Sequence, residues 1–335
     1  MSRYLVAGGA GYVGSHVVLA LLDAGHQPVV LDNLSTGHRD AVPAGVTFIE
    51  ACLSDRERLA EVFRAWKFDA VFHLAALSLV GESMKDPLRY CRDNLSNGVN
   101  LAEAAVRAGC LRFVFSSTAA LFGVPKVTPI AEDAPTTPVN PYGQSKLMME
   151  QALGWAEAAH GLHSASLRYF NAAGADPLGR AGEDHDPETH LIPRAILATL
   201  GLAPPLHVFG TDYDTPDGTA IRDYVHVADL AAAHIAVLPR LEHGSVRYNI
   251  GNGSGHSVLE VMAAIERVSG RKVPYENGPR RAGDPPSLVA SSALLRAETG
   301  WTSRQARLDD IVRTAWNWHV AHPQGYAQRE AALTA

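Results

Sequence analysis

The chain has 335 residues and is poor in cysteine, in long hydrophobic runs and in excess positive charge. Its three cysteines, Cys52, Cys91 and Cys110, show neither CxxC spacing nor a nearby histidine, which argues against a disulfide framework and against a zinc site. No stretch approaches the roughly 20 apolar residues of a membrane span. A net charge of −6 gives no electrostatic reason to expect nucleic acid as a partner. We therefore expect reduced core cysteines, no bound metal and small-molecule partners.

The composition is that of a globular protein, with 47% hydrophobic and 19% charged residues. The length favours one large domain or two domains that share a cleft. The first residues lead directly into an apolar strand and a glycine turn, which leaves no room for a cleavable signal sequence. The sequence therefore predicts a cytoplasmic protein.

The first half alternates between strand-like and helical patterns. Apolar runs of strand length cover residues 4–7, 29–32, 46–49, 70–73, 112–116 and 165–169. Apolar residues at spacings of three and four mark helices over 12–24, 56–66, 96–108 and 142–160. Repeated βαβ units predict a Rossmann-like, doubly wound parallel sheet.

The alternation of strand-like and helical patterns stops after Asn171, where a loop-like segment leads into a helix near Leu191. We expect a nucleotide-binding domain over 1–172 and a smaller α/β substrate domain over 173–335. A helix and a strand within about 226–252 are expected to return to the first domain.

A glycine-rich turn follows the first strand directly, with Gly8, Gly11 and Gly14 at the spacing GxxGxxG. Glycine permits the tight turn, the close approach of backbone N–H groups to a pyrophosphate and the packing of helix on strand. Asp32 ends the next strand, where a carboxylate can accept hydrogen bonds from ribose hydroxyls and repel the extra phosphate of NADP. The pattern predicts a dinucleotide site that favours NAD.

Tyr142 and Lys146 are four residues apart at the start of a helix, so they share one face. A neighbouring ammonium group lowers the pKa of a phenol, and this pair can therefore supply a general base. Thr118 follows the fifth strand at the carboxyl edge, where open α/β sheets bind ligands. The three residues predict a catalytic site acting on a hydroxyl group.

These features resemble the extended short-chain dehydrogenase/reductase superfamily over nearly the whole chain. Within it, the sequence is most similar to the UDP-glucose 4-epimerase family. The glycine turn and the YxxxK pair mark only the superfamily. The narrower similarity depends on VGES at 80–83, LRYFN at 167–171, GTAIRDYVHV at 218–227 and RRAGDPP at 280–286.

The resemblance implies that Thr118 orients the sugar's 4-hydroxyl, that Tyr142 accepts and returns its proton, and that Lys146 holds the nicotinamide ribose. UDP-galactose and UDP-glucose would interconvert through a transient 4-keto sugar and NADH, with NAD regenerated and retained. A homodimer formed through helical segments 101–108 and 147–158 is also implied, although those faces could equally pack on the sheet.

The resemblance extends to two sets of binding residues. For the cofactor they are Gly8, Gly11, Tyr12, Val13, Gly14, Asp32, Asn33, Asn94, Ser116, Tyr142, Lys146 and Tyr169. For the substrate they are Thr118, Asn171, His190, Leu191, Arg222, Arg280, Asp284 and Leu288. Arg222 and Arg280 correspond to diphosphate ligands and Asp284 to a ribose ligand. For Arg222, the alternative to substrate binding is a structural ion pair with Asp223 or Asp229. For Tyr169, the alternative to cofactor binding is a position in the core.

Several positions depart from the family pattern, among them Ala7 and Ser78. Cys52 replaces an aspartate that commonly meets the adenine amino group, and Asp55 is a candidate substitute. Phe122 and His190 stand where tyrosine and asparagine are frequent. Leu288 is intermediate in size at a position that limits room for a 2-acetamido group, so N-acetylated UDP-sugars stay open as substrates.

Three alternatives remain beside the main interpretation. A 4,6-dehydratase would carry Asp-Glu after the active-site threonine, whereas this chain has Ala119 and Ala120. Epimerases of UDP-N-acetylglucosamine, UDP-glucuronate or UDP-pentoses are the runner-up. A non-catalytic NAD-binding regulator is disfavoured because Tyr142 and Lys146 are both present.

Overall fold

The computed structural model describes residues 1–281 and 284–327. Residues 282–283 of the RRAGDPP segment and the end of the expected second domain, 328–335, lie outside the described residues. Among the described residues, no helix is long and apolar enough to cross a membrane.

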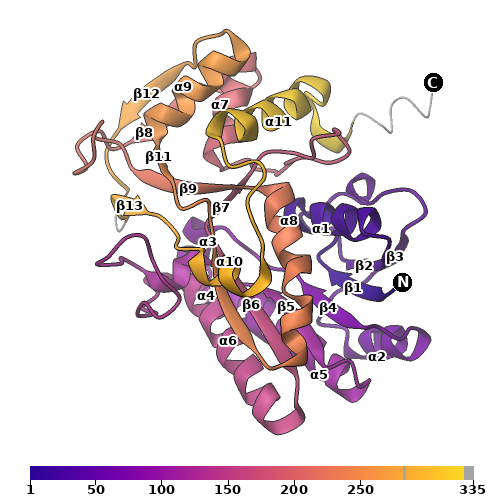
Figure 1. Cartoon of the computed structure of the whole chain (residues 1–335). Helices are drawn as coiled ribbons and strands as arrows, with labels where there is room; N and C mark the ends of the chain where they lie inside the picture. Colours follow the sequence, from indigo (N-terminus) through magenta and orange to yellow (C-terminus); the bar gives the residue numbers. More distant parts are fainter. Residues whose placement is uncertain (282–283, 328–335) are drawn as a thin grey trace, which may run out of the picture.

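A seven-stranded parallel sheet forms the larger part of the molecule (Figure 1). Its strands, in spatial order, are β10 (Val246–Ile250), β6 (His163–Tyr169), β5 (Arg112–Ser116), β4 (Ala70–His73), β1 (Arg3–Ala7), β2 (Gln27–Asp32) and β3 (Thr47–Glu50). Every strand pair is parallel, and the order reverses direction between β1 and β4. The predicted Rossmann-like fold is confirmed, and the predicted strands agree with the observed ones within two residues.

Helices cover both faces of this sheet, because its strands are apolar on both sides. One face packs against α1 (Tyr12–Asp23) and α8 (Val227–Ala236). The other packs against α2 (Arg56–Ala65), α5 (Asn97–Arg107) and α6 (Pro141–His160). Short helical segments complete this part: η1 (Arg39–Ala41), α3 (Val80–Lys85), α4 (Pro87–Tyr90), η2 (Cys91–Ser96), η3 (Ala119–Phe122) and η4 (Leu238–Glu242).

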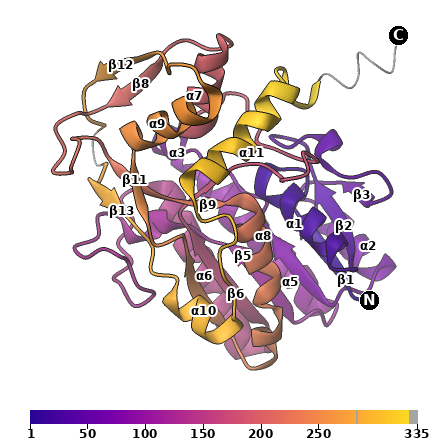
Figure 2. The ribbon, with the colours of Figure 1, turned by 45° about the horizontal axis from the view of Figure 1, so that its top comes forward.

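The second part of the chain builds two small sheets and three packed helices (Figure 2). One sheet contains β11 (Gly255–Ser257), β9 (Ile221–His226), β13 (Ser287–Leu288) and β7 (Asn171–Ala173), and the other contains β8 (Leu206–Phe209) and β12 (Tyr275–Gly278). A separate core joins α7 (Leu191–Leu200), α9 (Val258–Ser269) and α11 (Leu308–Ala321). The remaining elements are α10 (Ala293–Thr299) and η5 (Gly325–Ala327).

The connection between the two parts is short. Strand β6 ends at Tyr169, and β7 begins at Asn171. The small sheet of β7 and β9 therefore continues from the carboxyl edge of the large sheet, which is the edge at which doubly wound folds bind ligands.

The three cysteines are free thiols, but only Cys110 is buried, while Cys52 and Cys91 are partly exposed. The expectation of three core cysteines is therefore wrong for two of them. Cys52 follows the edge strand β3 and Cys91 begins η2, so neither has a helix or strand on every side.

Candidate active site

The glycine turn between β1 and α1 leaves no space for side chains at two positions. A Cβ on Gly8, whose φ is +84°, would lie 2.3 Å from the Ala75 nitrogen, and a Cβ on Gly14 would lie 1.9 Å from the Gly8 oxygen. Helix α1 starts after Gly11, which supplies no side-chain cap. The first N–H groups of α1 can therefore serve an anion, as a pyrophosphate site requires.

The carboxylate of Asp32 is fixed beside this turn. It accepts hydrogen bonds from the Ala10 nitrogen at 2.9 Å and from the Leu34 nitrogen at 2.9 Å. Burial raises the pKa of Asp32, and these N–H donors partly offset the increase. The structure therefore places an ordered acceptor at the end of β2, next to the glycine turn.

The residues expected near the adenine of the cofactor, Asn33, Cys52 and Asp55, contact other protein groups in the structure. The Asn33 amide lies 3.8 Å from the Cys52 sulfur, to which the Ser54 hydroxyl donates at 3.0 Å. Asp55 caps α2 by accepting from the Arg58 nitrogen at 2.9 Å. Since that carboxylate already serves the helix, Asp55 is a poor substitute for the missing aspartate.

Tyr142 and Lys146 lie on the first turns of α6, which the Asn140 side chain caps. Both side chains are buried. The Lys146 ammonium donates to the Ser116 carbonyl oxygen at 2.9 Å and lies 5.0 Å from the centre of the Phe115 ring. Burial lowers the pKa of Lys146 to about 7.

The phenol of Tyr142 forms a pair with Thr118. Burial raises the pKa of Tyr142, and a hydrogen bond with the Thr118 side chain acts in the opposite direction. The ammonium group of Lys146 donates to the Ser116 carbonyl oxygen. The lowering of the pKa of Tyr142 by Lys146 together with a bound nicotinamide stays a prediction.

Three further predicted cofactor residues surround this group. The Ser116 hydroxyl lies 3.0 Å from the His234 Nε2 atom, and the Tyr169 ring is centred 6.3 Å from the His234 ring. Asn94 accepts from the Leu77 nitrogen at 2.8 Å and donates to the Ser145 hydroxyl at 3.1 Å. Asn94 thus connects η2 to α6.

Tyr12 and Val13 are the first residues of α1, and the Tyr12 hydroxyl donates to the Gly174 oxygen at 2.7 Å.

The small sheet carries three predicted substrate residues, Asn171, Arg222 and Leu288. Leu288 of β13 is in register with Arg222 of β9, and Asn171 of β7 donates to the Asp223 carbonyl at 3.0 Å. The Arg222 guanidinium forms an ion pair with Asp284. Leu288 also packs against a small buried cluster of Leu121, Phe122 and Ile130.

Arg222 forms its ion pair with Asp284, so the expected alternative of an ion pair with Asp223 or Asp229 is wrong. The Asp223 carboxylate accepts backbone N–H groups of Asn252, Gly253 and Ala290. The Asp229 carboxylate accepts the Ser303 hydroxyl and two backbone N–H groups of the same loop. Both acids are therefore engaged in fixing loops.

Tyr213 is a residue that the sequence analysis missed. The Arg280 guanidinium lies 4.4 Å from the centre of the Tyr213 ring, and its Nε atom donates to Asp212 at 2.6 Å. The Tyr213 hydroxyl is buried and has no hydrogen-bond partner among the described residues. Burial and Asp284 raise the pKa of Tyr213, while Arg222 and Arg280 lower it. This phenol therefore lies near both predicted diphosphate arginines, Arg222 and Arg280.

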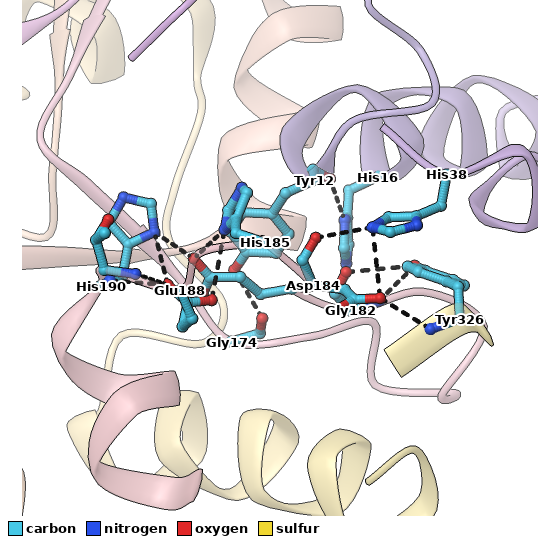
Figure 3. A network of polar contacts seen from close by, with 12 residues as sticks. Tyr12, His16, His38, Gly174, Gly182, Asp184, His185, Glu188, His190 and Tyr326 are labelled. Carbon is cyan, nitrogen blue, oxygen red and sulfur yellow. Dashed lines mark hydrogen bonds and ion pairs between the residues drawn. The ribbon is translucent and has the colours of Figure 1, made fainter. Parts of the chain in front are cut away.

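His190 and Leu191 begin α7 (Figure 3 shows His190). Leu191 packs against the core of the second part. The His190 Nδ1 atom lies 2.6 Å from a Glu183 carboxylate oxygen. His190 therefore faces an acidic residue that sequence reasoning did not connect with it.

The site combines three features at the carboxyl edge of a doubly wound sheet: the glycine turn, an ordered aspartate and a buried group of tyrosine, threonine and lysine. Together they define a class of proteins. It is the class of dinucleotide-dependent enzymes that act on a hydroxyl-bearing carbon. The model of the NAD dependent epimerase/dehydratase family matches residues 4–251, and the chain belongs to this family.

Proteins with nearly full-length similarity narrow the comparison. The UDP-glucose 4-epimerase of Azospirillum brasilense is 52% identical over 331 residues, which cover 98% of this chain and 95% of that protein. The crystal structure of UDP-glucose 4-epimerase from Brucella ovis in complex with NAD has a TM-score of 0.92 and 45% identity, covering 95% of this chain and 98% of that one. The Bifidobacterium longum enzyme in complex with NAD+ and UDP has a TM-score of 0.91 and 36% identity, covering 97% of this chain and all of that one, 100%.

Proposed function

We propose that this chain is a UDP-glucose 4-epimerase, which interconverts UDP-galactose and UDP-glucose. The observation that carries the proposal is the buried pair of Tyr142 and Thr118 beside Lys146, next to the glycine turn. Ala119 and Ala120 follow Thr118, so no acid–base pair for dehydration stands there. Relatives of about 50% identity that bear this enzyme's name support the assignment and do not favour the other epimerases.

The residues present fit NAD. Gly8 and Gly14 permit the close backbone packing of the turn that a pyrophosphate site requires, and Asp32 offers an acceptor for the adenosine ribose. Lys146 is a buried cation with a backbone carbonyl as its hydrogen-bond partner, so it can also donate to a second ribose. When bound, NAD would take a hydride from C4 of the sugar and return it.

The proton chemistry belongs to this chain's own side chains. Thr118 orients the 4-hydroxyl, and Tyr142 accepts its proton as the C4–H bond breaks, which leaves a 4-keto sugar. After the sugar turns its other face, Tyr142 would return the proton to the oxygen as C4 regains its hydrogen from the cofactor. Because every proton and hydride is returned, the reaction needs no external oxidant or reductant.

Binding must hold the nucleotide firmly and leave the sugar free to turn. We assign the diphosphate to Arg222 and Arg280, the uridine ribose to Asp284, and contacts near the diphosphate to Asn171 and His190. Leu191 and Leu288 would line the same site. Arg222 pairs with Asp284 in the free protein, so substrate would replace one anionic partner of this guanidinium by another.

The same proposal covers architecture and assembly. We assign residues 1–172 and about 226–252 to the NAD-binding domain, and the rest of 173–335 to the substrate domain. The free thiols fit a reducing compartment, and cytoplasmic location is part of the proposal.

A homodimer is proposed through the outer face of α5 and α6. Residues that include Leu95, Val99, Met148 and Trp155 line a hollow there, and Trp155 is 77% exposed. An exposed apolar surface of this kind marks a protein contact. The inward residues of the same helices, such as Leu101, pack on the sheet instead.

The proposed chemistry is tested with UDP-galactose carrying deuterium at C4. We expect the UDP-glucose formed to retain deuterium at C4, because the hydride never leaves the site. Loss of the label to solvent or to added NAD would contradict the proposal.

A further inference from the structure

Four side chains with nitrogen or oxygen ligand atoms converge on the segment between β7 and α7. They are Glu183, His185, Glu188 and His190, and one ligand atom from each lies within 4.8 Å of all the others. Figure 3 labels His185, Glu188 and His190. Neither the predicted catalytic group nor the proposed cofactor site includes Glu183, His185 or Glu188. No metal site was expected from the sequence, since the cysteine spacings exclude a zinc motif and these ligands are histidines and glutamates instead.

The separations within this cluster suit ligands around one ion. The His185 Nδ1 atom lies 3.3 Å from a Glu183 oxygen and 3.5 Å from a Glu188 oxygen, and the His190 Nδ1 atom lies 3.6 Å from Glu188. Ligands at about 2.0–2.1 Å from a tetrahedral ion stand about 3.3–3.4 Å apart. The fourth contact, His190 to Glu183 at 2.6 Å, is a hydrogen-bond length that a small rotation of the His190 ring would open.

The Nδ1 atom of His185 is the most informative of these atoms. It is buried and, among the described residues, makes no hydrogen bond of acceptable geometry, although two carboxylates lie close by. An imidazole nitrogen directed between two carboxylates from different residues is placed as a ligand beside its neighbours in a coordination shell.

Burial and charge point to a divalent ion. Glu183 is 4% exposed, and the Glu188 side chain is 9% exposed. Two such carboxylates require compensating positive charge. Two imidazoles with two carboxylates favour zinc-like transition metals over calcium or magnesium, which prefer oxygen ligands alone. His190 is half-exposed and gives an ion access from solvent.

The segment is already held in place by its surroundings. Both the Thr189 and His190 nitrogens donate to one Glu188 oxygen, at 2.7 and 2.8 Å, which leaves the other oxygen near His185. On the other side, the Tyr12 ring meets the His185 ring edge-on at 6.0 Å. The ligands thus need little rearrangement to bind an ion.

We propose that Glu183, His185, Glu188 and His190 bind one divalent transition-metal ion of the zinc class. The ion fixes the conformation of the segment before α7, next to Tyr12 at the start of α1, and the orientation of His190. This role is structural: no reaction step passes through the ion, and its link to the proposed function is the orientation of His190, which is also a proposed substrate contact.

The test measures metal in the full chain, produced without an affinity tag and purified without chelators. We expect one zinc-class ion per chain by elemental mass spectrometry. Protein stripped of metal should give visible cobalt absorption of a tetrahedral site when titrated with Co²⁺. Glu183→Gln and His185→Asn should remove both signals, with folding of each variant checked by circular dichroism.

The matched control is His207→Asn, which removes the exposed His207 beside Glu276 and should keep the metal and the cobalt spectrum. Absence of stoichiometric metal together with a cobalt spectrum of the hydrated ion would overturn the proposal and leave a network of protonated imidazoles paired with carboxylates. Equal loss of metal in the control would overturn it as well. Because substrate is absent from every measurement, failure here is distinct from failure of the epimerase assignment.

Discussion

Glu150 and Arg168 form a buried, two-pronged ion pair, with the Nε atom 3.0 Å and the terminal nitrogen 2.7 Å from the two carboxylate oxygens. The Ser117 hydroxyl donates to the same carboxylate at 2.5 Å. Glu150 lies one turn beyond Lys146 on α6, and Ser117 precedes Thr118. This contact therefore fixes the helix that carries Tyr142 against the strand end that carries Thr118.

Removing one partner of this pair should destabilise the protein. Glu150→Ala leaves the Arg168 charge buried and unpaired, which costs about 3–5 kcal/mol. Urea unfolding measures the loss. The exposed pair of Arg58 and Glu61 is the control, and Glu61→Ala should cost less than about 1 kcal/mol. Equal losses for the two variants would mean that the buried pair has no special structural role.

Tyr142→Phe removes the proposed base and keeps the ring. We expect turnover to fall about 10²–10⁴-fold, while bound NAD stays near the wild-type amount. Steady-state kinetics and the nicotinamide content of the purified protein measure the two effects. Tyr275→Phe, at an exposed tyrosine, should change neither. Unchanged turnover in Tyr142→Phe would refute its role as base.

Two glycines of the turn should respond differently to alanine. In Gly14→Ala the new Cβ meets the Gly8 oxygen at 1.9 Å, so we expect a loss of about 1–3 kcal/mol or failure to fold. In Gly11→Ala the nearest contact is an ordinary 3.5 Å, so stability should be kept while NAD retention falls. Thermal unfolding and cofactor content distinguish the two, and retained NAD in Gly11→Ala would contradict the pyrophosphate assignment.

Lys146 should make the stability of the cofactor-free protein depend on pH. Its pKa is about 7 when folded and about 10.4 when unfolded, so between these values only the unfolded chain binds the proton. The cost of burying the charge is complete below pH 7 and disappears as the pH rises. Relative to Lys146→Met, the wild type should gain up to about 1.4 kcal/mol per pH unit in this window. If the free energy of unfolding changed with pH in the same way in both proteins, the lowered pKa of Lys146 would be refuted.

Trp155→Glu should convert the proposed dimer to a monomer, because the charge would be buried between two copies of α6. Light scattering measures the mass in solution. Leu178→Glu, at a residue that is 78% exposed elsewhere, should leave the mass unchanged. A wild-type monomer would exclude the dimer directly.

Local patterns predicted the parallel sheet because each βαβ unit has a recognisable sequence pattern within about 30 residues. The glycine turn, the strand that ends at Asp32 and the YxxxK helix all depend on short-range geometry. The π-helical turn at 91–96 breaks the regular spacing before α5, and the predicted helix start at Ser96 reflects this.

Long-range pairs could not be predicted in the same way. Arg222 has acids next to it in sequence, yet its partner is Asp284, brought close by the pairing of β13 with β9. Tyr213 reaches Arg280 through the fold rather than through any spacing in the sequence. Lys146 donates to a carbonyl oxygen of β5, a partner that the spacing along the helix does not indicate.

The most direct test of the account is to mix the purified protein with UDP-galactose without adding NAD and to follow UDP-glucose by NMR. The account predicts conversion, because the cofactor stays bound through each cycle. No conversion, even after NAD is supplied, would contradict the assignment of Tyr142, Thr118 and Lys146 to this reaction.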